Sequence, residues 1–223
     1  MQTGRVPEMY REDVEDLLLP LLAPYFPAGE ERKYFMRLDD ASSKDGIGSM
    51  GPFKDAAGVI ASLLTSRRAF STLLSTVEAG EGAWEMMHLL PWRVDISGDN
   101  EWRVFVPADG NVRAVSQYSE RLVGWGDDRE SGYKRLNEVV PVILECYEVF
   151  RRCAETEGRA LPENGYVLDV HAALRGGVWV VEPVELNGFG AQMSSGSGLF
   201  NWLADWRRLY GLEEEIEVRV VGP

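Results

Sequence analysis

The stretch that decides the fold is Tyr166-Val167-Leu168-Asp169-Val170-His171, followed across Arg175-Gly176-Gly177 by Val178-Trp179-Val180-Val181-Glu182-Pro183-Val184-Glu185-Leu186-Asn187-Gly188-Phe189-Gly190. Two apolar runs around a pair of glycines are the pattern of a β-hairpin. In a hairpin that turns at these glycines, the numbers of opposite residues sum to about 353. The sequence therefore predicts that Asp169 and Glu185 face each other on neighbouring strands.

Three oxygen-bearing side chains are predicted to share one face of this hairpin. Asn187 lies two residues after Glu185, so strand alternation places both on the side of Asp169. Mg²⁺ takes a few protein oxygens and completes its octahedron with phosphate and water. The pattern indicates a Mg²⁺ site that also holds nucleotide phosphates, and a solvent-facing acidic hairpin is the alternative. Removing Asp169 from such a like-charged cluster is expected to relieve repulsion and leave the fold intact.

The composition is that of an acidic globular protein. The chain has 223 residues, enough for one to one and a half domains with a buried core. Its net charge of −13 argues against general nucleic-acid binding, but it does not exclude a local basic pocket. The sequence contains neither an apolar run of ~18 residues nor a signal-peptide core, so we expect a cytoplasmic protein without a membrane segment. Cys146 and Cys153, seven residues apart on one predicted helix, are expected to be reduced.

Helices and strands are predicted along the rest of the chain. The Asp109-Gly110 turn predicts a hairpin between 101–106 and 112–117. A short amphipathic helix is predicted over 9–25, broken by Pro20, Pro24 and Pro27. Its inward-facing residues are predicted to be Leu17, Leu18, Leu21 and Leu22. The remaining predicted elements are a strand over 33–38, a glycine-rich loop over 39–51, helices over 55–77 (interrupted at most around 65–67), 133–157 and 198–210, and an edge strand over 218–221. This order indicates an α+β or α/β chain dominated by antiparallel pairs.

Several other residues carry weaker signals. Lys44-Asp45-Gly46-Ile47-Gly48 suits phosphate binding but lacks the Gly-Lys-Ser/Thr end of a P-loop. His171 should share the face of Asp169, where it contacts phosphate or an acceptor substrate, or is simply packed and hydrogen-bonded. The serine-rich stretch 194–198 lacks the nucleophile elbow of a hydrolase and favours a loop and helix cap.

Segments spread over residues 33–205 carry a resemblance. They include Phe35-Met36-Arg37-Leu38-Asp39-Asp40-Ala41-Ser42-Ser43-Lys44-Asp45, Glu101-Trp102-Arg103-Val104-Phe105-Val106, Ala114-Val115-Ser116-Gln117, Val167-Leu168-Asp169-Val170, Val178-Trp179-Val180-Val181, Glu185-Leu186-Asn187-Gly188-Phe189-Gly190 and Leu199-Phe200-Asn201-Trp202. Taken in this order, they resemble the cell division cycle protein 123 family of the ATP-grasp clan. The resemblance implies an α+β, ATP-grasp-like fold whose two subdomains grip ATP between antiparallel sheets. That fold is expected over 33–210, after a helical arm at 1–32 and before a tail at 211–223.

The resemblance also implies site residues. Lys44 matches a lysine expected to reach the ATP phosphates, and Arg37 and Arg103 match strand arginines. Met87 and His88 lie where the clan's adenine-binding linker is expected, and a structural role in an apolar run is the alternative for His88. Asp169, Glu185 and Asn187 match the metal ligands, with Glu185 where the family often has Asp. Outside an ATP site, strand arginines usually face solvent or form salt bridges. The sequence departs from the family at Tyr118, which follows Ser116-Gln117 where the family has arginine.

Two functions follow as expectations. The first is that of a Mg²⁺-ATP-binding assembly factor for translation initiation factor two, as in eukaryotic members of the family, with a subunit of that complex as protein partner. The second is that of an ATP-dependent ligase on the same fold, which joins a carboxylate to an amine and uses a small-molecule or aminoacyl-tRNA acceptor. Neither the residues nor the resemblance assigns a catalytic residue.

Overall fold

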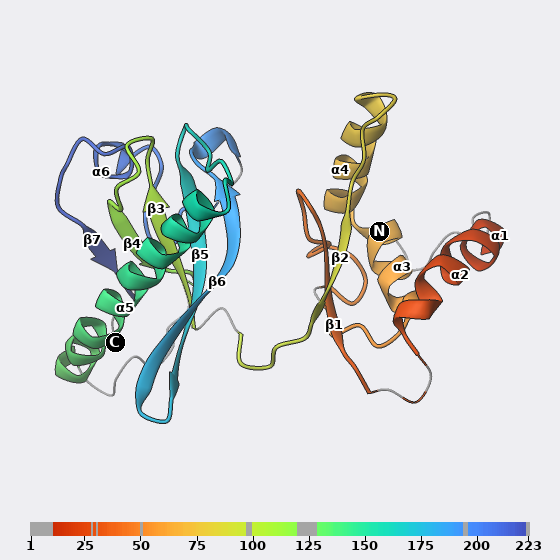
Figure 1. Ribbon diagram of the computed structural model, residues 1–223, viewed down its shortest axis with the longest axis horizontal. Helices are drawn as coiled ribbons and strands as arrows, with labels where there is room; N and C mark the ends of the chain where they lie inside the picture. The colour runs from red at the N-terminus through yellow and green to blue at the C-terminus, as the bar shows by residue number, and fades with distance from the viewer. Residues whose placement is uncertain are drawn as a thin grey trace. The chain divides into compact units, whose positions relative to one another are not determined.

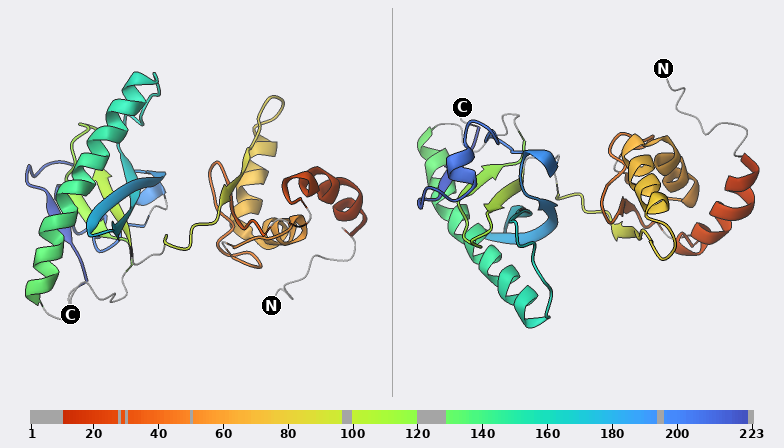
Figure 2. Two further views of the ribbon diagram at one scale, coloured as in Figure 1. Left: turned by 60° about the horizontal axis from the view of Figure 1, so that its bottom comes forward. Right: turned by 90° about the horizontal axis from the view of Figure 1, so that it is seen from above.

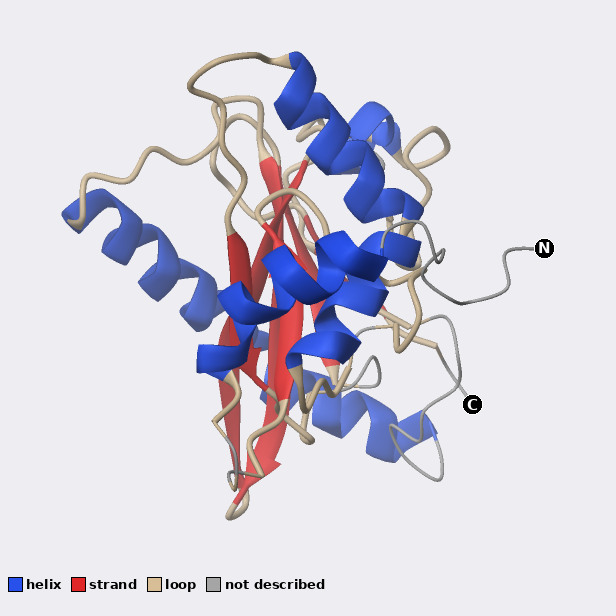
Figure 3. Cartoon of the chain, turned by 90° about the vertical axis from the view of Figure 1, so that its right-hand side faces the viewer, coloured by secondary structure: helices blue, strands red, loops and turns tan. Residues whose placement is uncertain are grey.

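The chain forms two compact units, Met1–Arg93 and Val94–Pro223 (Figure 1). The computed structural model describes residues 11–27, 29, 31–49, 51–96, 100–119, 129–193 and 196–221. Helices and strands both contribute substantially (Figure 3), which confirms the predicted α+β class. Within the described ranges, no helix is both long and apolar enough to cross a membrane.

The first unit opens with a helical run of mixed type. It comprises α1 (Arg11–Asp13), the π-helical η2 (Val14–Leu18), α2 (Leu19–Leu22) and the 3₁₀ turn η3 (Ala23–Tyr25). The predicted break at Pro20 is wrong, because the chain stays helical through this proline, which lies at the start of α2 directly after the π-helical η2. The prediction that the leucines of this helix face inward is confirmed only in part. Leu22 packs against the core with Phe26, whereas Leu17 and Leu21 are exposed.

A two-stranded sheet and two helices complete the first unit. Strand β1 (Tyr34–Leu38) pairs antiparallel with β2 (Met87–Pro91). Helix α3 (Ala56–Thr65) is followed at once by α4 (Arg67–Glu78), which confirms the predicted interruption. Ser66 separates the two helices because it adopts an extended conformation, and its hydroxyl caps α4 by accepting from the Ala69 N–H at 3.1 Å. Met36, Phe53 and Val59 form the core beneath the sheet.

The second unit is built on a five-stranded sheet in the order β6-β5-β3-β4-β7. The strands are β3 (Glu101–Val106), β4 (Ala114–Gln117), β5 (Tyr166–Arg175), β6 (Val178–Gly188) and β7 (Glu217–Arg219). All neighbours are antiparallel except β4 and β7, which run parallel. The two predicted hairpins, β3–β4 and β5–β6, and the predicted edge strand are confirmed. The edge strand β7 lies in the segment expected as a tail, 211–223, so part of that segment belongs to the sheet.

One face of this sheet is covered by the long helix α5 (Arg129–Thr156) (Figure 2). Its Val139, Ile143 and Tyr147 pack onto alternate sheet residues such as Val104 and Leu168. The helix confirms the apolar periodicity predicted over 133–157. Cys146 and Cys153, both on α5, are free thiols.

The opposite face carries a second apolar cluster and the segment that follows β6. This segment contains the 3₁₀ turn η4 (Ala191–Met193) and the short helix α6 (Trp206–Leu209). The predicted helix over 198–210 is therefore wrong for most of its length. The Asn201 side chain accepts from the N–H groups of Leu203 and Ala204, so it supports a turn where a helix was expected. The cluster consists of Phe105, Ala114, Val167, Phe189, Phe200, Trp202 and Leu209.

Candidate functional site

The candidate site lies on the sheet face opposite α5, where β3, β5 and β6 run side by side. The register pairs Asp169 with Arg103 on one side and with Glu185 on the other. The predicted meeting of Asp169 and Glu185 is confirmed. Asn187 joins them, because its side-chain amide donates to Asp169 at 3.0 Å and to Glu185 at 3.4 Å. Four polar side chains from three strands thus converge on one point.

An irregularity in β6 enlarges this polar face. Asp169 is paired with Glu185, but the next residue, Val170, is paired with Pro183, so Val184 is an extra residue in β6. In a regular strand, Glu182 and Glu185 would point to opposite faces. Because of the bulge, Glu182 lies opposite His171 and Glu185 lies opposite Asp169, and both carboxylates share one face. Sequence reasoning missed Glu182, and Pro183 was the available signal because prolines in sheets favour bulges.

Arg103 is the main partner of Asp169. Its Nε and Nη2 atoms each donate to one carboxylate oxygen at 3.0 Å, which is the bidentate geometry. Its Nη1 donates to the carbonyl of Gly196, and its guanidinium carbon lies 4.6 Å from the centre of the Tyr118 ring. Arg103 is therefore a buried, ion-paired strand arginine in this structure.

Burial makes negative charge costly at Asp169, which is 1% exposed. Loss of hydration raises the pKa of Asp169 to about 7, and repulsion from Glu185 and Glu101 adds to this, although Arg103 opposes the rise. The site thus brings the carboxylates of Asp169 and Glu185 together beside one buried arginine. The structure also changes the expectation for removing Asp169, because a variant without this carboxylate would leave Arg103 buried without its charge partner.

The side chains fit a Mg²⁺ ion as an incomplete coordination shell. Asp169 and Glu185 supply carboxylate oxygens, and Asn187 supplies an amide oxygen once its amide, which now donates its N–H, is turned. Within the described part of the chain, no three acidic, histidine or cysteine side chains gather to hold a metal ion. Such an ion would therefore need further oxygens, and Mg²⁺ commonly takes these from phosphates and water.

A second polar network adjoins the site. His171 is fully buried, and its Nε2 lies 2.8 Å from the backbone oxygen of Asp95. Arg175 donates to the carboxylates of Asp95 at 2.8 Å and Glu182 at 3.0 Å. These contacts fasten the segment at Asp95 to the β5–β6 hairpin. His171 is thus buried and hydrogen-bonded within the fold. This is the second of the two roles predicted for it from the sequence.

The other predicted residues lie in the first unit. Arg37 on β1 is paired across the sheet with His88 on β2, and Met87 is paired with Leu38. His88 Nε2 lies 2.7 Å from Asp39 Oδ1, and this hydrogen bond lowers the pKa of Asp39. Arg37 donates to the backbone oxygens of Leu38 and Asp39, each at 3.2 Å.

The loop that carries Lys44 is fastened to the junction of α3 and α4. Asp45 accepts from the Ser66 hydroxyl at 2.5 Å and from the Arg67 N–H at 3.0 Å. Gly46 lies so close to α3 that a Cβ atom there would stand 2.3 Å from the backbone oxygen of Ser62. Lys44 is half-buried between these anchored positions. The structure therefore holds Lys44 on a packed loop in the first unit, whereas Arg103, Asp169, Glu185 and Asn187 belong to the second.

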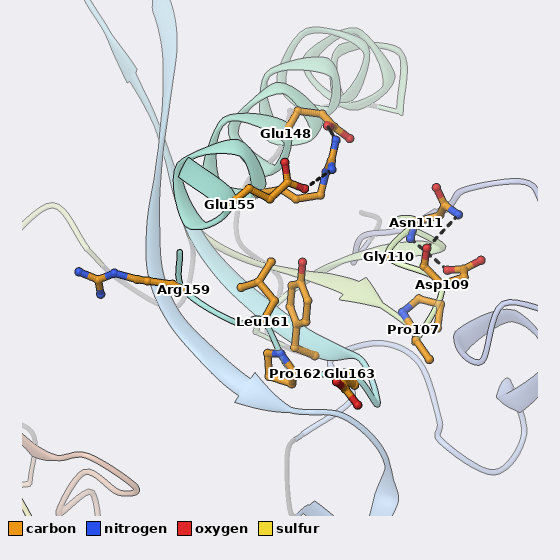
Figure 4. A pocket seen from close by; sticks show the side chains of 13 residues that line it. Pro107, Asp109, Gly110, Asn111, Glu148, Glu155, Arg159, Leu161, Pro162 and Glu163 are labelled. Atoms are coloured by element: carbon orange, nitrogen blue, oxygen red, sulfur yellow. Dashed lines mark hydrogen bonds and ion pairs between the residues drawn. The ribbon is translucent and has the colours of Figure 1, made fainter. Parts of the chain in front are cut away.

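A hollow of about 510 Å³ lies elsewhere on the second unit, between the β3–β4 turn, α5 and the segment before β5 (Figure 4). Its lining includes Asp109, Glu148, Glu155 and Glu163. Arg151 is ion-paired with Glu148 at 3.0 Å and Glu155 at 2.6 Å. None of the predicted site residues lines this hollow.

Comparisons with known proteins identify the fold. No family model matches the sequence, and no curated protein matches it significantly. Two solved structures of Cdc123 from Schizosaccharomyces pombe match the fold. The first aligns with a TM-score of 0.59 at 17% identity and covers 86% of this chain and 72% of that one. The second, a C-terminally truncated form, aligns with a TM-score of 0.59 at 16% identity. This alignment covers 86% of this chain and 73% of the truncated form. The chain therefore has the fold of Cdc123, as the ordered motifs in its sequence predicted.

Proposed function

We propose that this protein binds Mg²⁺-ATP and acts as an assembly factor for a translation initiation complex, with a subunit of initiation factor two as its partner. The likeness to Cdc123 supports the proposal at the level of the fold. The convergence of Asp169, Glu185 and Asn187 beside Arg103 carries it at the level of chemistry. A cluster of two carboxylates and an amide oxygen favours a divalent cation, and the incomplete shell favours phosphate oxygens as its further ligands.

The proposal gives each residue a role in binding. Asp169, Glu185 and Asn187 hold the ion, which screens the triphosphate from the carboxylates. Arg103 keeps Asp169 oriented through two hydrogen bonds. Lys44 and Arg37 are assigned to phosphate oxygens, and the β2 segment with Met87 and His88 is assigned to the adenine. These roles concern binding and orientation, and no bond-breaking step is assigned.

Calorimetric titration of the full chain with ATP, in Mg²⁺ and in EDTA, tests the proposal. We expect binding in Mg²⁺ and weakening by tenfold or more in EDTA, because the carboxylates repel the bare triphosphate. The matched variant is Glu185→Gln, which keeps the size of a half-buried side chain and removes its charge. This variant should lose most of the Mg²⁺ dependence while its melting temperature stays near that of the wild type. Equal affinity in Mg²⁺ and EDTA for the wild type would refute the metal assignment.

A further inference from the structure

Helix α4 presents its large apolar side chains to the outside of the first unit. Ala69, Thr72 and Thr76 make up its buried and half-buried side. Its outward side carries a row of four residues, which we call the α4 stripe: Phe70, 64% exposed; Leu73, 41%; Leu74, 42%; and Val77, 76%. Small and polar residues inside with large apolar residues outside reverse the usual pattern of a surface helix. Such a contiguous apolar row marks an interaction surface.

The spacing and the flanking charges of the stripe describe its partner. Positions 70, 73, 74 and 77 follow the i, i+3, i+4, i+7 pattern of a helix that packs along another helix. At 100° per residue, Arg67 at the start of α4 and Glu78 at its end lie on the same side of the stripe. Both residues are exposed. One end of the surface is therefore basic and the other acidic, with an apolar centre.

We propose that the α4 stripe is a self-association surface, which pairs antiparallel with α4 of a second copy of this chain. A two-fold axis between Leu73 and Leu74 places Phe70 against Val77 of the second copy. The same axis brings Arg67 of each copy near Glu78 of the other. A parallel pair would instead place like charges together at both ends, so the charges favour the antiparallel arrangement. This inference is independent of nucleotide binding.

The proposed dimer should be weak and reversible. Four side chains from one helix cover less surface than the ~1,600 Å² of a standard interface. The dimer is therefore expected to dissociate on dilution. Its stability should come mainly from the apolar row, and its orientation from the charged ends.

Sedimentation equilibrium of the full chain over a range of concentrations tests the proposal. The weight-average mass should rise from 25.0 kDa toward twice that value as concentration increases. Leu73→Asp should abolish the rise, because it places two like charges at the centre of the interface. Ser75→Asp is the matched control, since it adds the same charge at an exposed position of α4 away from both the stripe and its charged flank, and it should preserve the rise. A mass that stays at 25.0 kDa, or persistent association of Leu73→Asp, would overturn the proposal.

A charge exchange tests the antiparallel geometry. Arg67→Glu should weaken association about fivefold, because two symmetry-related attractions become repulsions. The double variant Arg67→Glu/Glu78→Arg should restore it. Acidic residues suit the start of a helix and basic residues its end, so the exchange does not weaken α4, and circular dichroism can check this. Failure of the double variant to recover association would contradict the antiparallel pair.

Discussion

Asp169 is subject to two opposing demands. Burial disfavours its charge, yet Arg103 beside it is equally buried and needs a carboxylate partner. The bidentate pair resolves this only in part, because Glu185 and Glu101 add negative charge nearby. Substitutions of Asp169 that remove only its charge should therefore change stability less than substitutions that remove the whole polar group.

We predict that Asp169→Ala lowers the free energy of unfolding by about 3 kcal/mol, because it leaves Arg103 buried without its charge partner. Asp169→Asn should cost less, about 1 kcal/mol, since its amide oxygen still accepts from Arg103. Urea unfolding at neutral pH, followed by tryptophan fluorescence, measures both. If Asp169→Ala were as stable as the wild type, relief of repulsion among the carboxylates would outweigh the ion pair.

At the scale of elements, β7 is fastened to the turn before α6 by one ion pair. Arg219 on β7 donates to both oxygens of Asp205, each at 2.8 Å, and also lies over the Phe200 ring. Asp205 in turn accepts from the backbone N–H of Asn201 at 2.8 Å. These contacts replace the continuous helix predicted over 198–210.

This pair predicts a dependence of stability on pH. The hydrogen bond from Arg219 lowers the pKa of Asp205 below its unfolded value of about 3.9. Its contribution is therefore fully present above that value and is lost as the pH falls through the lower, folded pKa. Asp205→Asn should cost about 1–2 kcal/mol at pH 7, and the difference from wild type should shrink below about pH 4. Urea unfolding across this range measures it, with Glu157→Gln, an exposed partner of Arg159, as a control that should change little. A difference that stays constant from pH 7 to pH 3 would contradict the assignment.

The sequence predicted local relations better than distant ones. The pairing of Asp169 with Glu185 followed from one turn, because hairpin register depends only on the residues around it. The salt bridge from Arg103 joins strands far apart in the chain, so no local pattern contained it. The regular alternation of side chains along β6 also fails at Val184. Because of the bulge there, Glu182 lies on the same face of the sheet as the site.

At the scale of the whole molecule, charge separates the two candidate functions. A transferase that handles tRNA is expected to carry a basic stripe. The net charge is −13, and Arg151 and Arg208, each next to another arginine, are ion-paired with glutamates. This balance favours a protein partner over an aminoacyl-tRNA substrate.

We therefore predict that a pull-down from extract of the source cells, with Mg²⁺-ATP present, recovers an identified subunit of the translation initiation complex. The purified chain alone should turn over ATP negligibly, because an assembly factor needs bound nucleotide and no acceptor. Glu185→Gln serves as the matched bait, and it should recover less of the subunit if capture depends on the ion-bound nucleotide. The opposite outcome is ATP consumption that requires an amino-acid mixture, together with a new amide-bonded product detected by mass spectrometry. That outcome would refute the assembly-factor proposal and identify an ATP-dependent ligase on the same fold, since only a ligase couples ATP loss to a new bond between two small molecules.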